Sequence, residues 1–287
     1  MTTSYDPKAT YDIEIWEEDF RQAPARMLLA RIWRPVGDGP FPVLLDLHGG
    51  AWASKNRTAN VDMAEAMARS GILTAAVDMR VSGEAPYPAS VQDANYAIRW
   101  LKMKAPEWGG DPGTTGVLGS STGGHLALLL GMRPDDARYN ALKLEGHAEI
   151  DARVAYVAAR SPISDPLARY NNARARGREK MVAHHHAWFD PWSTIEEGNP
   201  QMMLDRGEKV ALPPLLIMQG GDDDNVLPAF QVKFADSWRA AGGECQLEVF
   251  EGCSHLWVLD PGPQTDRAHE TLKAFIAQRI GALRKAA

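Results

Sequence analysis

Hydrophobic and polar residues follow two patterns along this chain, and each pattern predicts a kind of strand. In residues 11–20 and 26–34 apolar and polar side chains alternate, which is typical of a hairpin of antiparallel strands. Segments 41–47 and 72–77 are instead almost continuously apolar, as expected for parallel strands covered on both faces. The sequence therefore predicts an antiparallel hairpin that leads into a parallel sheet.

Predicted helices alternate with the apolar strands, and this alternation indicates the fold class. Segment 59–70 is amphipathic and is followed by Gly71 in a C-cap position, and a second helix is expected at 89–104. Further strands are expected at 153–159, 215–220 and 246–250, and further helices at 228–241 and 265–284. The pattern predicts an α/β fold in one domain, 1–287, with a mostly parallel central sheet and helices on both faces.

One long segment, about 160–212, departs from this rhythm. It is rich in charged residues, His, Trp and Pro, and no strand–helix alternation is visible in it. Long irregular segments in compact domains are usually lids or binding loops. We therefore expect a cap or lid insertion over the sheet and not a separate domain.

Composition and charge narrow the class of protein. The 287 residues are 45% hydrophobic and 24% charged, which is ordinary for a soluble globular domain. The formal net charge is −6 and no long basic run occurs, so we expect no nucleic-acid partner. We also expect no membrane segment or signal peptide, because no apolar run is long enough and the first twenty residues are acidic. Two cysteines, not expected to form a disulfide, favour a cytoplasmic location.

The stretch from Thr115 to Met132, TGVLGSSTGGHLALLLGM, is the most informative in the chain. It predicts a short strand, a tight turn and an apolar helix, with Ser121 at the centre of a G-x-S-x-G pattern. In a nucleophile elbow the serine occupies a strained strand-to-helix turn, and small residues two positions away let the chain pass. The helix would point its free N–H groups at the site where an oxyanion forms.

A catalytic serine needs a base and an orienting acid, and the chain offers both after predicted strands. Segment 221–226, GDDDNV, follows one strand, and His255 follows the next. Loops at the carboxyl ends of parallel strands are where α/β sheets hold their chemistry. Counting from Gly220 to Val226 favours Asp223 as the acid, whereas counting back from Pro228 favours Asp224.

Three further stretches carry a family resemblance. HGGAW at 48–52 resembles an H-G-G-G oxyanion loop, the segment from Asp78 resembles D-Y-R-L-A-P-E-x-x-x-P-A, and GSSTGGHLA resembles G-D-S-A-G-G-N-L-A. The chain thus resembles the α/β-hydrolase fold, and within it the hormone-sensitive-lipase-like and BD-FAE-like esterases. Two departures stand out: Ser120 replaces a common acidic residue, and Ala51 replaces the third glycine.

The resemblance implies a role for each site residue. Ser121 would attack the acyl carbon, His255 would move the proton, and Asp223 would fix the imidazole tautomer. The backbone N–H groups of Gly50, Ala51 and Thr122 would bind the oxyanion, where one donor typically contributes about 2.7–4 kcal/mol of barrier lowering. No cofactor is expected.

Aromatic residues and a histidine run complete the candidate site. Trp52 and Trp257 adjoin the oxyanion loop and His255, and we expect them to line the substrate pocket, with Trp188 and Trp192 of the insertion covering it. The run His184–His186 invites a metal, yet consecutive histidines point in different directions and lack partners at zinc-site spacing. We expect no metal site.

These observations predict a serine hydrolase. It would cleave small to medium carboxylic esters, with aromatic or apolar acids or alcohols, through an acyl-enzyme. The alternatives are an amidase of the arylformamidase kind, because that family shares the H-G-G-x-W loop, and an inactive ligand-binding relative. The expected partner is a small-molecule ester, and a homodimer is left open.

Overall fold

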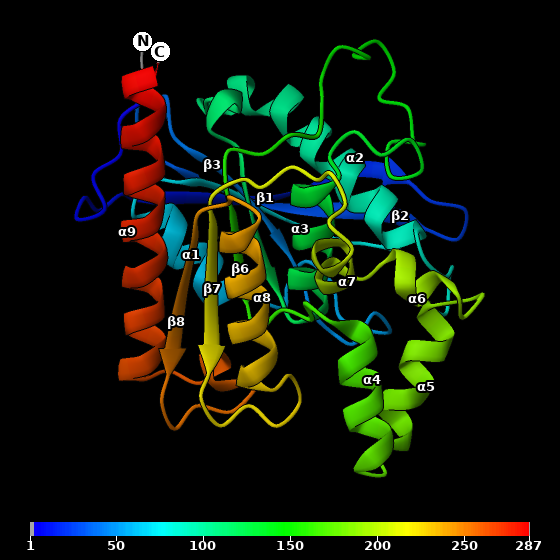
Figure 1. Ribbon diagram of the computed structural model, residues 1–287. Helices are drawn as coiled ribbons and strands as arrows, with labels where there is room; N and C mark the ends of the chain where they lie inside the picture. The colour runs from blue at the N-terminus through cyan, green and yellow to red at the C-terminus, as the bar shows by residue number, and fades with distance from the viewer. Residues whose placement is uncertain (1–2, 287) are drawn as a thin grey trace.

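A mostly parallel sheet of eight strands forms the centre of the computed structural model, which describes residues 3–286 (Figure 1). The strand order within the described residues is β1-β2-β4-β3-β5-β6-β7-β8. The strands are β1 (Ile13–Gln22), β2 (Met27–Pro35), β3 (Val43–Leu47), β4 (Leu73–Val77), β5 (Gly116–Ser120), β6 (Val157–Arg160), β7 (Leu215–Gly220) and β8 (Cys245–Phe250). Strands β1 and β2 pair antiparallel, β2 joins β4 antiparallel, and all later pairs are parallel. The predicted fold class is confirmed.

Burial explains why the inner strands could be predicted from the sequence. Every residue of β3, β4, β5 and β7 is buried, so each strand is apolar on both faces. Asp46 in the middle of β3 is a buried charged residue in this group of strands, and Thr74, Ser120 and Gln219 are buried polar ones. The antiparallel strand β1 has one buried residue, Phe20, and a largely alternating pattern. Continuous runs therefore identify strands between two helix layers, and alternation identifies the strands at the sheet's margin.

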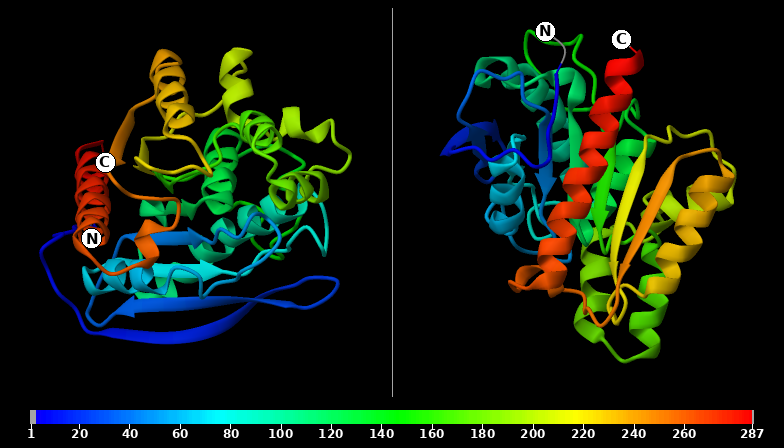
Figure 2. Two further views of the ribbon diagram at one scale, coloured as in Figure 1. Left: turned by 90° about the horizontal axis from the view of Figure 1, so that it is seen from below. Right: turned by 90° about the vertical axis from the view of Figure 1, so that its left-hand side faces the viewer.

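Helices cover both faces of the sheet (Figure 2). On one face α1 (Val61–Arg69) and α9 (Pro263–Ala286) contact each other and share an apolar cluster with β3, β5 and β7. On the other face lie α2 (Ala89–Lys104), α3 (Thr122–Met132) and α8 (Pro228–Ala240). Three short 3-10 helices add to these: η1 (Ala105–Trp108), η2 (Pro112–Thr114) and η3 (Trp257–Leu259).

The predicted insertion is largely helical. It holds α4 (Pro166–Ala175), α5 (Glu179–Trp188), α6 (Thr194–Glu197) and α7 (Pro200–Asp205). Two of these helices begin with a side-chain cap followed by proline, because Asp165 accepts from the Ala168 N–H and Asn199 accepts from the Met202 N–H. In Figure 1, α4 and α5 lie side by side at the end of the molecule where β7 and β8 finish.

One predicted strand was misplaced. Segment 153–159 was expected to be extended, but β6 spans Val157–Arg160. The Ala155 N–H donates to Thr115 O before the regular ladder begins, and Arg160, taken as the first residue of the insertion, is the last residue of the strand. Within residues 3–286 no helix has the length and apolar character needed to cross a membrane.

Candidate active site

Ser121 lies at the sharp turn between β5 and α3, as the G-x-S-x-G pattern predicted. Its backbone has φ 54° and ψ −111°, a conformation that residues other than glycine rarely adopt. The glycines on either side have no room for a side chain. A Cβ atom on Gly119 would lie 2.2 Å from Gly123 O, and one on Gly123 would lie 2.0 Å from Leu47 O. The turn therefore requires glycine at both positions.

Three predicted residues meet in one hydrogen-bonded chain. His255 Nε2 lies 2.9 Å from Ser121 Oγ, and His255 Nδ1 lies 2.7 Å from Asp223 Oδ2. This geometry suits a tautomer in which Nδ1–H donates to the carboxylate and Nε2 accepts from the hydroxyl. Ser121 and His255 are half-buried, whereas Asp223 is buried. Acyl transfer by a triad needs an acid that is shielded from water and a hydroxyl that a substrate can reach, and Asp223 and Ser121 fit these two requirements.

Asp223, and not its neighbour Asp224, faces the histidine. Burial alone would raise the pKa of Asp223, but the bond from His255 and the N–H groups of Val226 and Asn225 hold this pKa below its usual value. The Gln219 side chain donates a further bond to Oδ2. The Asp224 side chain is 62% exposed and pairs with Arg176 and Arg178.

The loop after β3 lies against the serine. A Cβ atom on Gly49 would be 3.4 Å from Ser121 Cβ. Gly50 has φ 108°, and a Cβ there would lie 2.1 Å from Ser54 O, so the loop requires glycine at this position. Among residues 3–286 the N–H groups of Gly50 and Ala51 donate to no protein acceptor. The N–H of Thr122 begins α3, where helical donors lack intrahelical partners.

Ala51 lies where the resembled H-G-G-G motif has its third glycine, and its backbone conformation is unfavourable for a residue with a side chain. Its φ is 56° and that of Trp52 is 58°. Such left-handed angles cost an L-residue about 1–2 kcal/mol each. The neighbouring N–H of Trp52 lies 3.4 Å from Thr122 Oγ1, which joins the loop to the first residue of α3. This hydrogen bond holds the loop against the helix that follows Ser121.

Trp52 links the loop after β3 to the insertion. Its indole Nε1–H donates to His125 Nδ1 at 3.3 Å, and His125 Nε2 bonds to Gly198 O at 2.7 Å. Burial lowers the pKa of His125 to about 4, so this histidine is a neutral link between the loop, α3 and the insertion. The Trp52 ring stacks on Trp188 with centroids 4.8 Å apart and an interplanar angle of 12°.

The expected substrate contacts of the tryptophans need correction. Trp188 is 0% exposed and its Nε1–H donates to Ser90 Oγ, so it is a core residue and not a pocket wall. Trp52 and Trp257 are also buried, Trp257 by stacking on Phe250. Of these four tryptophans Trp192 alone is half-buried, packed against Tyr170 and His186. Substrate contact by Trp192 stays a prediction.

Arg169 in α4 was not singled out by sequence reasoning. It is buried, its Nε and Nη2 donate to Asn225 Oδ1 at 3.0 and 2.7 Å, and Nη1 lies 3.3 Å from His185 Nε2. Its guanidinium also lies over the Trp52 ring. The insertion therefore contacts both the loop that holds Asp223 and the loop after β3. The Asp165–Pro166 pair was the sequence signal that could have revealed α4.

Two of the three histidines of α5 have hydrogen-bond partners of their own. His185 is buried, with Nδ1 bonded to Met181 O, and burial lowers its pKa to about 3. His186 bonds to Tyr170 Oη through Nε2. Within residues 3–286, no three His, Cys, Asp or Glu side chains are grouped so that they could hold a metal. The absence of a metal remains a prediction.

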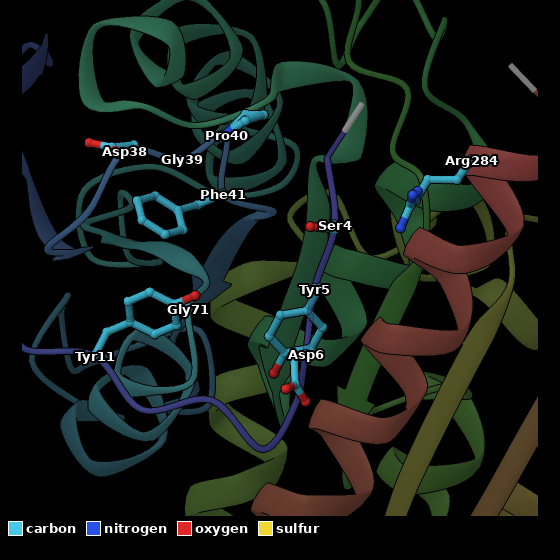
Figure 3. A pocket seen from close by; sticks show the side chains of 10 residues that line it. All are labelled: Ser4, Tyr5, Asp6, Tyr11, Asp38, Gly39, Pro40, Phe41, Gly71 and Arg284. Atoms are coloured by element: carbon cyan, nitrogen blue, oxygen red, sulfur yellow. The ribbon is translucent and has the colours of Figure 1, made fainter. Parts of the chain in front are cut away.

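A separate cavity of about 560 Å³ lies at the other end of the strands (Figure 3). It is lined by residues that precede β3 and β4 together with the N-terminal segment and Arg284 of α9. Figure 3 shows Tyr11 and Phe41 on one side and Arg284 on the other. None of its lining residues belongs to the Ser121–His255–Asp223 chain, so it is not part of the candidate active site.

A serine on a strand–turn–helix elbow, with a histidine and an acid on later loops of a mostly parallel sheet, defines an α/β hydrolase. The chain belongs to the BD-FAE family, whose model matches residues 32–238.

Several known proteins of similar sequence or structure are esterases by name. Esterase LipC of Mycobacterium tuberculosis is 28% identical over 265 residues, which cover 89% of this chain and 62% of LipC. The chain thus spans less than two thirds of that curated relative. A Thermogutta terrifontis esterase, solved with propionate bound, has a TM-score of 0.73 at 23% identity and 94% coverage of both chains. Esterase B of Lactobacillus rhamnosis has a TM-score of 0.79 at 18% identity, covering 98% of this chain and 90% of its own.

Proposed function

We propose that this chain is a serine carboxylesterase with Ser121, His255 and Asp223 as its triad. The observation that carries the proposal is the continuous chain from Asp223 Oδ2 through His255 to Ser121 Oγ. The uncommitted N–H groups of Gly50 and Ala51 beside it support an oxyanion hole, with the Thr122 N–H as the third donor.

The chemistry follows from these positions. Ser121 Oγ forms a bond to the ester carbonyl carbon while its proton moves to His255 Nε2. The N–H groups of Gly50, Ala51 and Thr122 hold the oxyanion. Collapse breaks the ester C–O bond, and the His255 proton goes to the alcohol. Water then attacks the acyl-enzyme with His255 as base, and the carboxylic acid leaves as Ser121 regains its proton.

The substrate class is a small or medium ester with an apolar or aromatic acid or alcohol. The names of the relatives and neighbours support ester hydrolysis. The Thermogutta terrifontis esterase was solved once with propionate bound and once with butyrate bound. A cytoplasmic location, supported by the two free cysteines, and the homodimer left open above remain predictions.

The test is the hydrolysis of p-nitrophenyl acetate, butyrate and benzoate, with an N-formyl anilide as the amidase substrate. We expect ester turnover by the parent and a loss of about 10⁶-fold in kcat for Ser121→Ala, because the triad acts as a unit. Ser120→Ala is the matched control, since its side chain is buried but makes no hydrogen bond to the triad residues. Equal activity of Ser121→Ala and parent would refute the proposal. Faster anilide than ester cleavage would favour the amidase.

A further inference from the structure

A second, smaller cavity borders the segments that carry the candidate active site. Its volume is about 230 Å³, and it is lined by residues 58–63, Arg160, Val258 and Leu259. Residues 58–63 run from the oxyanion loop into α1, and Val258 and Leu259 follow His255 in η3. Arg160 also accepts the Ser121 N–H through its backbone carbonyl, at 2.8 Å.

Arg160 is a buried cation with few partners. Its side chain ends on the α1 and α9 face of the sheet and the residue is 7% exposed. One contact is made, from Nη2 to Asn60 Oδ1 at 3.4 Å. Among residues 3–286, Nε and Nη1 have no hydrogen-bond partner, and Arg160 is one of the residues that line the cavity. The buried Arg169, by contrast, uses all three of its nitrogens.

The charge of Arg160 is incompletely balanced by the protein. Among the described residues its one polar side-chain contact is to the neutral amide of Asn60 and not to a carboxylate. The nearby acid is Asp46, whose two oxygens accept from Asn60 Nδ2 at 3.1 and 3.0 Å. Burial raises the pKa of Asp46 to about 7, so this carboxyl is partly protonated at neutral pH. A buried cation without a full counter-charge is costly, and a bound anion would lower that cost.

The first turn of α1 adds donors to the same cavity. Asn60 occupies the N-cap position but its side chain makes no cap hydrogen bond, because it faces Asp46 and Arg160. The N–H groups at the start of α1 are therefore uncapped, and Val61, Asp62 and Met63 line the cavity. A helix N-terminus with free N–H groups favours an anion. The exposed Asp62 carboxylate at this turn disfavours a multiply charged one.

We propose that this cavity binds a small carboxylate that has an apolar body. The carboxylate would take the free donors of Arg160 and the first turn of α1, and the body would lie on Val61, Met63, Val258 and Leu259. The volume is below the 300 to 1,000 Å³ typical of drug-sized ligand sites, which limits the occupant to a short aliphatic or a single-ring acid. The site stands on these contacts alone, although an ester hydrolase would release acids of this kind.

The experiment is a titration by calorimetry and by NMR of the labelled protein, with propionate and benzoate as ligands. Propionamide is the neutral control, and phosphate and chloride are the inorganic anions titrated for comparison. Four proteins are compared: the parent, Ser121→Ala, Arg160→Met and Ala59→Phe. The last variant fills the cavity from a half-buried wall residue and leaves Arg160, Asn60 and Asp46 in place, so it stays informative if Arg160→Met does not fold.

We expect one equivalent of propionate or benzoate to bind the parent and Ser121→Ala alike, and to bind Arg160→Met and Ala59→Phe at least about tenfold more weakly. Propionamide should not bind. Loss of binding in Ser121→Ala with retention in the other variants would place the acid at the catalytic serine and overturn the proposal. Tighter binding of phosphate or chloride than of either acid, or no saturable binding at all, would overturn it equally. Because Ser121→Ala is included, the result does not depend on esterase activity.

Discussion

At the residue scale, two adjacent aspartates occupy opposite environments. Asp223 is buried and bonded to His255, whereas Asp224 is exposed and paired with arginines of the insertion. We expect Asp223→Asn to lower kcat about 10⁴-fold, because the amide supports the wrong imidazole tautomer. Asp224→Asn should keep nearly parental activity, since an exposed ion pair contributes only about 0–1 kcal/mol of stability. Steady-state kinetics on one acetate ester checks both, and a larger loss in Asp224→Asn would contradict the assignment.

Asp46 should make the stability depend on pH. Its pKa is about 7 in the folded chain, against a reference of 3.8. Between these values the folded state keeps a proton that the unfolded state releases, so stability falls as pH rises. The limiting slope is about 1.4 kcal/mol per pH unit. Urea denaturation from pH 4 to 8 should therefore show a smaller decline in Asp46→Asn than in the parent. Parallel curves for the two proteins would show that Asp46 does not titrate in this range.

Some residues of the site could be predicted from the sequence, whereas others could be found only in the structure. The grouping of Ser121, His255 and Asp223 could be predicted because each follows a strand and the motifs specify their spacing, and their catalytic roles stay a prediction. Arg160 and Arg169 were not, because a buried charge is defined by the partners that tertiary structure brings to it. Asp46 is an acidic residue inside the apolar run of β3, but its partner Asn60 could be identified only from the fold.

At the element scale, the insertion packs into the core, and its tryptophans should differ in effect. Trp188→Ala removes a fully buried ring and is expected to lower the free energy of unfolding by about 3–5 kcal/mol. Activity on every ester should then fall with the folded fraction. Trp192→Ala, at a half-buried site, should cost less stability and change the ratios of kcat/KM across an ester series, by about 10–200-fold if it contacts substrate.

Thermal denaturation and an ester series from acetate to benzoate measure both effects. A Trp188→Ala protein that keeps parental stability would contradict the core assignment. Uniform ratios in Trp192→Ala would remove that residue from the substrate contacts.

Strands were easier to predict than the helices of the insertion. The central strands are covered on both faces, which demands continuous apolar runs. The helices α4 to α7 are short and polar, so no strong periodicity identified them, although Asp165–Pro166 and Asn199–Pro200 marked two of their starts. Strand β6 was predicted to begin too early because Val154, Ala155 and Tyr156 are also apolar, whereas the regular pairing with β5 begins at Val157.

At the scale of the whole molecule, one apolar cluster joins the insertion to the sheet. It includes Trp188, Phe189 and Met203 together with residues of β3, β5 and β7. We therefore expect one cooperative unfolding transition, with the same urea midpoint by far-ultraviolet circular dichroism and by tryptophan fluorescence. A separately folding insertion would instead give two transitions or two midpoints.

The strained backbone conformation of Ser121 lowers the stability of the folded chain. A serine with φ 54° and ψ −111° occupies a region that glycine enters freely, and such strain costs on the order of 1–3 kcal/mol. Selection for stability alone would favour glycine at this position. The hydroxyl of the proposed nucleophile therefore costs stability, and Ser121→Gly should give an inactive protein with a larger free energy of unfolding than the parent.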